Sequence, residues 1–77
     1  MLSAKSFGKN SRFITKEAIY AKHLIEDAEK LKIPLQLYIE PKNGKPEYII
    51  LCPKTFYQDT LFLLKILAYN KEFTAIP

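Results

Sequence analysis

The sequence has very little cysteine and histidine. Among its 77 residues there is one cysteine, Cys52, and one histidine, His23. A single cysteine excludes an intrachain disulfide, and one cysteine with one histidine cannot supply the ligands of a structural zinc site. Because small secreted domains usually rely on several disulfides, we expect a cytoplasmic protein. We also expect it to hold no metal and no cofactor. We expect Cys52 to be a buried structural residue rather than a reactive thiol.

Long hydrophobic runs and nucleotide-binding motifs are also missing. The longest apolar stretch, residues 61–69, is interrupted by Lys65 and is far shorter than the roughly 20 residues that cross a bilayer. No phosphate-binding loop or dinucleotide fingerprint is present. No cleft is predicted at the carboxylates of Glu40 and Glu47. No nucleophile is predicted beside the pair of His23 and Asp27. We therefore expect no membrane span, no catalytic residues and no enzymatic activity.

Arginine is nearly absent, since lysine outnumbers it 11 to 1. Reading of base edges in the major groove depends mainly on the bidentate arginine side chain. A chain with Arg12 alone is poorly equipped to recognise a duplex sequence. Any nucleic-acid binding would act through lysine charges on phosphates and would depend strongly on salt.

Apolar residues are plentiful by contrast. They make up 48% of the chain, and aromatic residues make up 13%, which excludes a disordered protein. The length corresponds to one small domain. A domain of this size buries only about 60% of its unfolded surface, so its own core is small.

The net charge of +4 lies entirely in the first 16 residues, which contain four basic residues and no acid. We interpret residues 1–14 as a basic N-terminal arm and residues 15–77 as a single α+β domain. The arm either packs its aromatic rings on the domain or presents them with its charges to nucleic acid or an acidic partner. The residues proposed for such contacts are Lys5, Phe7, Lys9, Arg12, Phe13 and Lys16.

A first helix is predicted from about Thr15 to Lys32. Thr15 is a plausible N-cap, and apolar residues from Ile14 to Leu31 recur at spacings of three and four. Pro34 ends the helix. His23 and Asp27 lie one turn apart and are expected to form a surface pair.

A β-hairpin follows over residues 35–52. Its alternating strands flank Asn43-Gly44, the sequence typical of a type I′ turn. With a two-residue loop, Lys42 is opposite Lys45. The other residues of the two strands are then opposite each other in turn, as far as Leu35 opposite Cys52. One face of the hairpin, expected to take the helices, then carries Leu35, Leu37, Ile39, Tyr48, Ile50 and Cys52.

The last predicted helix runs from Phe56 to about Tyr69 and is apolar on nearly every side. Thr55 and Gln58 have the spacing of a capping box, and Asn70 is a plausible C-terminal stop. One helix, a hairpin and this apolar helix give an α-β-β-α order. Helices on opposite faces of the hairpin could bury the excess of apolar side chains. Otherwise the excess is an interface, and we expect a homodimer formed by the last helix or by pairing of the free hairpin edges. The residues proposed for partner binding are Tyr38, Leu51, Phe62, Ile66 and Tyr69.

The composition thus favours a small non-enzymatic protein that binds another protein, as a regulator, inhibitor or adaptor. It would act as a homodimer through an apolar helix surface and the basic arm. The abundance of Lys, Ile, Asn, Tyr and Phe is typical of AT-rich genomes and associates the chain with phage or mobile-element accessory proteins. The alternative is a binder of RNA or single-stranded DNA with weak sequence specificity, using the N-terminal lysines, arginine and phenylalanines.

Overall fold

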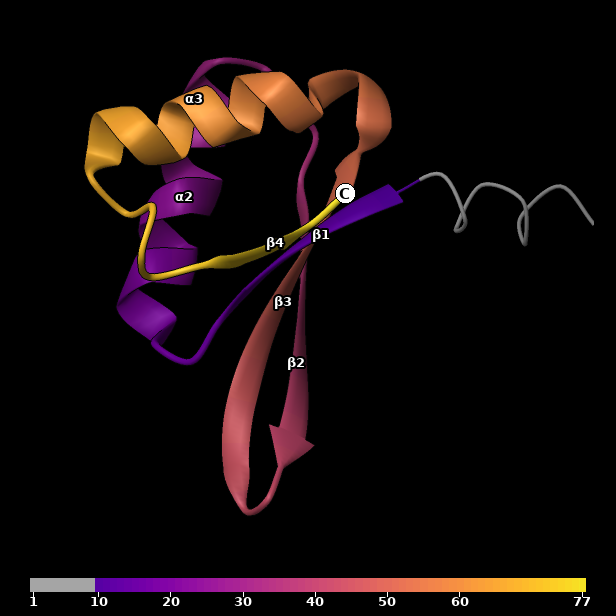
Figure 1. Cartoon of the computed structure of the whole chain (residues 1–77), viewed down its shortest axis with the longest axis vertical. Coiled ribbons are helices and arrows are strands. Elements are labelled where there is room, and N and C mark those ends of the chain that lie inside the picture. The colour runs from indigo at the N-terminus through magenta and orange to yellow at the C-terminus, as the bar shows by residue number, and fades with distance from the viewer. Residues whose placement is uncertain (1–9) are drawn as a thin grey trace, which may run out of the picture.

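The computed structural model describes residues 10–77, which form a small α+β domain of two α-helices and a four-stranded antiparallel sheet. The strands lie in the order β2-β3-β1-β4 (Figure 1). Along the chain the elements are β1 (Asn10–Thr15), α2 (Ala18–Lys30), β2 (Gln36–Lys42), β3 (Lys45–Pro53), the 3₁₀ turn η1 (Lys54–Phe56), α3 (Tyr57–Leu67) and β4 (Thr74–Ile76).

Strand β1 corrects the predicted extent of the N-terminal arm. Its side chains alternate, because Ser11, Phe13 and Thr15 are buried while Arg12 is exposed. β1 lies between β3 and β4 and pairs with both. The arm therefore does not reach residue 14, and its earlier residues fall outside the described part of the chain. The sequence shows no alternation of apolar residues here, because two of the three buried residues, Ser11 and Thr15, are polar.

Strands β2 and β3 pair in the register expected from the Asn-Gly turn. Lys42 is opposite Lys45, and Gln36 is opposite Leu51 at the other end. Asn43 and Gly44 have φ angles of 55° and 80°, which a type I′ turn requires. Two steps beyond Gln36 the same register would bring Pro34 opposite Pro53. Because neither proline has an N–H to donate, the ladder ends there.

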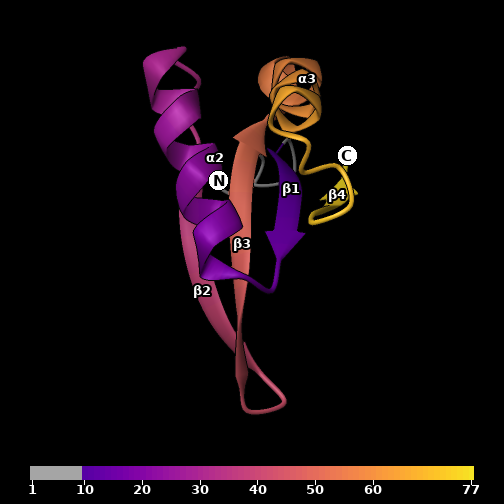
Figure 2. The ribbon, with the colours of Figure 1, turned by 90° about the vertical axis from the view of Figure 1, so that its left-hand side faces the viewer.

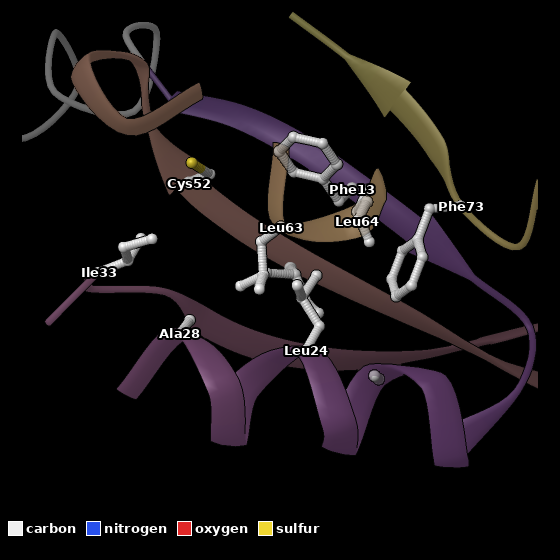
Figure 3. Close-up of a cluster of buried hydrophobic side chains, with 10 residues drawn as sticks. Phe13, Leu24, Ala28, Ile33, Cys52, Leu63, Leu64 and Phe73 are labelled. Carbon is white, nitrogen blue, oxygen red and sulfur yellow. The ribbon is translucent and has the colours of Figure 1, made fainter. Parts of the chain in front are cut away.

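Both helices cover the same face of the sheet (Figure 2). Helix α2 buries Ala21, Leu24 and Ala28, and α3 buries Leu63 and Leu64. Figure 3 shows these side chains meeting others that come from the sheet and the C-terminal segment. The sheet and tail contribute Phe13, Ile50, Cys52 and Phe73 to this core.

The tip of the hairpin extends beyond the helices (Figure 1). Leu37 and Ile39 share the covered face with Ile50, yet they are 42% and 60% exposed. Leu37 is opposite Ile50, which is fully buried, so the expectation that the helices cover the whole face is wrong along the edge strand β2. Leu31, the last residue of the predicted apolar stripe, is the C-cap of α2 and is 58% exposed.

The N-termini of the helices differ from those predicted. Thr15 is the last residue of β1, and its hydroxyl accepts the N–H of Glu17 at 3.3 Å instead of capping a helix there. Glu17 is the N-cap of α2. The expected capping box of Thr55 and Gln58 does not form, because η1 precedes α3 and no side chain caps it.

Each helix ends in a Schellman motif, with a non-glycine residue in the left-handed conformation. After α3, Ala68 has a φ of 62°, and the N–H of Tyr69 donates to the Leu64 carbonyl at 2.8 Å. After α2, Lys32 has a φ of 63°, and the N–H of Ile33 donates to Ala28 at 2.8 Å. These motifs, rather than Asn70 or Pro34 alone, stop the helices.

Candidate protein-binding surface

The face of the sheet opposite the helices is lined by apolar residues from four adjacent strands. In one row Tyr38, Ile49 and Ile14 lie side by side on β2, β3 and β1. In the next row Leu51 lies beside Arg12, which lies beside Ile76. We call these residues the open face: Arg12, Ile14, Tyr38, Ile49, Leu51 and Ile76.

No helix covers the open face within residues 10–77 (Figure 2). Tyr38 is 49% exposed, and the three isoleucines and Leu51 are partly exposed. The solvated side of an antiparallel sheet usually carries polar side chains in alternation with the buried ones. A row of aliphatic and aromatic residues in that place is instead typical of a surface that another molecule covers.

Arg12 gives this apolar surface a positive centre. It lines a shallow hollow with Tyr38, Glu40, Ile49 and Leu51. The acids of this face lie toward the hairpin tip, where Glu40 is opposite Glu47. Glu47 approaches Lys42 at 3.9 Å and is mostly covered, so its charge is already partly compensated. A guanidinium between aliphatic side chains is suited to a carboxylate, which it can bind through two parallel hydrogen bonds.

The residues predicted to bind a partner fall on two separate surfaces. Tyr38 and Leu51 belong to the open face. Phe62 and Ile66 are on the outer side of α3, away from the sheet, and are 62% and 64% exposed. The structure therefore does not bring the two sets together.

Tyr69 is partly buried and packs against the core. Its ring meets Tyr20 edge-on at 4.7 Å between centroids, and its hydroxyl lies 2.7 Å from Nδ1 of His23. His23 was expected to pair with Asp27, which instead approaches Lys30 at 3.9 Å. Because 46 residues separate His23 from Tyr69, no local sequence pattern could have indicated this link between α2 and the end of α3.

The residues predicted to touch nucleic acid are also divided. Arg12 lies on the open face, and Lys16 is exposed in the connection from β1 to α2. Phe13 is fully buried in the core and stacks on Tyr57 at 5.5 Å between centroids, so its ring cannot stack on a base. Lys5, Phe7 and Lys9 lie outside the described residues.

Cys52 is enclosed where β3 passes into η1. Its Sγ donates to the Pro53 carbonyl at 3.3 Å and lies 3.3 Å from the hydroxyl of Thr60. The Thr60 hydroxyl donates to the Phe56 carbonyl at 2.8 Å. Burial raises the pKa of the Cys52 thiol. The hydrogen bond with Thr60 opposes this rise, and the nearby charge of Asp59 adds to it. The thiol therefore stays protonated near neutral pH.

Neither a metal-binding cluster nor a membrane-spanning helix is found among residues 10–77. No group of three or more histidine, cysteine or acidic side chains is arranged to hold a metal ion in this part of the chain. None of the described helices has the length and apolarity needed to cross a membrane.

Comparisons with known proteins give no family for the chain. It matches no protein-family model, no curated protein and no solved structure.

Proposed function

We propose that this chain is a non-enzymatic protein-binding module that holds its partner on the open face of the sheet. The observation that supports the proposal is the group of apolar residues around Arg12 on the open face, namely Ile14, Tyr38, Ile49, Leu51 and Ile76, which come from four paired strands. Aromatic and aliphatic residues at the centre of an interface supply most of its binding free energy.

Arg12 defines the chemistry of the partner. A partner that buried it without a counter-charge would pay a large desolvation cost. The complementary surface is therefore apolar with one carboxylate opposite the guanidinium. Glu40 and Glu47 at the edge of the open face would repel a second acid there and fix the orientation of the partner.

Capture from a lysate of the source cells with matched variants tests the proposal. Leu51→Lys changes the open face, and Phe62→Lys makes the same change in charge on the outer side of α3. We expect wild type and Phe62→Lys to retain the same protein, and Leu51→Lys to lose it. Nuclease treatment of the lysate should leave the retained protein unchanged.

The opposite patterns contradict the proposal. Loss of the protein with Phe62→Lys but not with Leu51→Lys would place binding on α3. Loss on nuclease treatment would show that the partner is held through nucleic acid. Circular dichroism melts of both variants ensure that neither result reflects unfolding.

Binding of RNA or single-stranded DNA is the second candidate. It is favoured by the positions of Arg12 and Tyr38, which together line the hollow of the open face. A cation beside an exposed aromatic ring can hold a phosphate and stack a base. Under this proposal, random oligonucleotides bind at about 50 mM salt, and Arg12→Ala lowers the slope of log affinity against log salt by about one. Absence of binding at that salt concentration removes this candidate.

A further inference from the structure

Strand β2 is an edge of the sheet, and its residues before Glu40 lack the usual protection. All seven of its residues are exposed, from Gln36 to Lys42. The opposite edge, β4, is only three residues long and is followed by Pro77, and short edges rarely recruit another strand. On β2 the sequence Leu37-Tyr38-Ile39 contains no charge, proline or bulge.

The hairpin register determines which backbone groups of β2 are free. In a hairpin with a two-residue loop, the closing pair, here Lys42 and Lys45, exchanges both hydrogen bonds. The even-numbered residues of β2 therefore bond to β3. Leu37 and Ile39 direct their N–H and C=O groups away from the sheet, while Pro41 has no N–H and closes the free stretch.

We propose that a second copy of this chain adds to the edge of β2, with a twofold axis at Tyr38. In this arrangement Leu37 exchanges hydrogen bonds with the partner's Ile39, and Ile39 with the partner's Leu37. Leu37 and Ile39 each have a free N–H and a free C=O, so the pairing requires no N–H donor from Pro34 or Pro41. It joins two four-stranded sheets into one sheet of eight strands.

The side chains that the twofold axis at Tyr38 brings together are also compatible with each other. On the covered side, Leu37 is opposite the partner's Ile39, so two exposed aliphatic residues cover each other. On the open side, Tyr38 is opposite its own copy, and Gln36 is opposite the partner's Glu40. The amide of Gln36 can donate to that carboxylate, and aromatic and complementary polar pairs stabilise neighbouring strands.

The consequence goes beyond the proposed function. A twofold axis perpendicular to the sheet places both open faces on the same side. The two apolar surfaces then form one continuous face with Tyr38 of each copy at its centre. The dimer and the binding of another protein are nevertheless measured separately, because the dimer needs no other protein.

Replacement of Ile39 tests the backbone bonds. Because the Ile39 N–H points away from β3, Ile39→Pro removes a donor to the second copy and leaves the hydrogen bonds within the hairpin intact. Ile39→Thr keeps the N–H and is the matched control. By light scattering after size-exclusion chromatography, we expect wild type and Ile39→Thr at about twice the 9.0 kDa mass of the chain. Ile39→Pro should dissociate at least about tenfold more readily, because two hydrogen bonds are lost per dimer.

Cysteine cross-linking tests the register independently of stability. Directly opposed residues of a pair without mutual hydrogen bonds have Cα atoms about 4.5 Å apart, which a disulfide can bridge. We expect Tyr38→Cys to give a disulfide-linked dimer under mild oxidation, whereas Glu40→Cys, which is opposite Gln36 rather than itself, remains uncross-linked. The native Cys52 is buried and does not compete.

Three results would overturn the proposal. One is a wild-type monomer at all concentrations. Another is an Ile39→Pro variant that is folded by circular dichroism and dimerises as wild type does. The third is cross-linking of Glu40→Cys that equals that of Tyr38→Cys. A dimer lost in Phe62→Lys but kept in Ile39→Pro would assign the contact to α3.

Discussion

At the scale of single residues, the backbone conformation of Ala68 lowers the stability of the fold. Its φ of 62° lies in the left-handed region, where a Cβ costs roughly 1–2 kcal/mol and where glycine has no such cost. Part of this gain is offset because glycine has more conformational freedom in the unfolded chain. We therefore expect Ala68→Gly to raise the free energy of unfolding by about 0.5–1 kcal/mol in urea denaturation. Ala18→Gly, at another exposed alanine but in the helical region of α2, should lower the free energy of unfolding. An equal loss in both variants would contradict the argument.

Cys52 gives the domain a dependence on alkaline pH. Burial raises the pKa of the thiol above its ordinary value of 9.0, so the folded chain holds the proton after the unfolded chain has released it. The free energy of unfolding therefore keeps its full contribution from this group below about pH 9 and declines as the pH rises further. We expect urea denaturation between neutral pH and pH values above 9 to show a steeper decline for wild type than for Cys52→Ala. Parallel declines would show that the thiol is not the cause.

At the scale of elements, the sequence predicts the hairpin and the helices, because their patterns lie within short stretches of the chain. Asn43-Gly44 requires two positive φ angles in succession and a two-residue loop, so the register of β2 with β3 is predicted correctly. The outer ends are not, because the strands begin at Gln36 and end at Pro53 rather than at residues 35 and 52. The helices also follow from their spacing, although their ends do not. Thr15, for example, had the chemistry of an N-cap but is required as a buried strand residue, since its side chain points into the core beside Phe13.

The two strands that the sequence does not predict, β1 and β4, depend on distant partners. β1 pairs with residues 48–53, and β4 pairs with β1 across almost the whole chain. Three residues such as Thr74–Ile76 carry too little pattern to indicate a strand by themselves. The open face was missed for the same reason, because Arg12, Leu51 and Ile76 become neighbours only when β1 is placed between β3 and β4.

At the scale of the whole molecule, the distribution of phenylalanine separates folding from binding. Phe13 has no exposed surface and stacks on Tyr57, whereas Phe62 is 62% exposed. Removing a buried phenylalanine side chain costs about 3–5 kcal/mol, a large part of the 5–15 kcal/mol that stabilises a typical domain. We expect Phe13→Ala to be largely unfolded near 37 °C by circular dichroism.

Phe62→Ala makes the same chemical change on the surface and is the matched control. Its thermal midpoint should stay near that of wild type, because surface substitutions usually change stability by less than about 0.5 kcal/mol. If Phe13→Ala melted like Phe62→Ala, β1 would not be part of the folded core. In that case neither the open face nor the sheet that extends from β2 could exist as described. The stability of this pair of variants therefore tests the architecture on which both proposals depend.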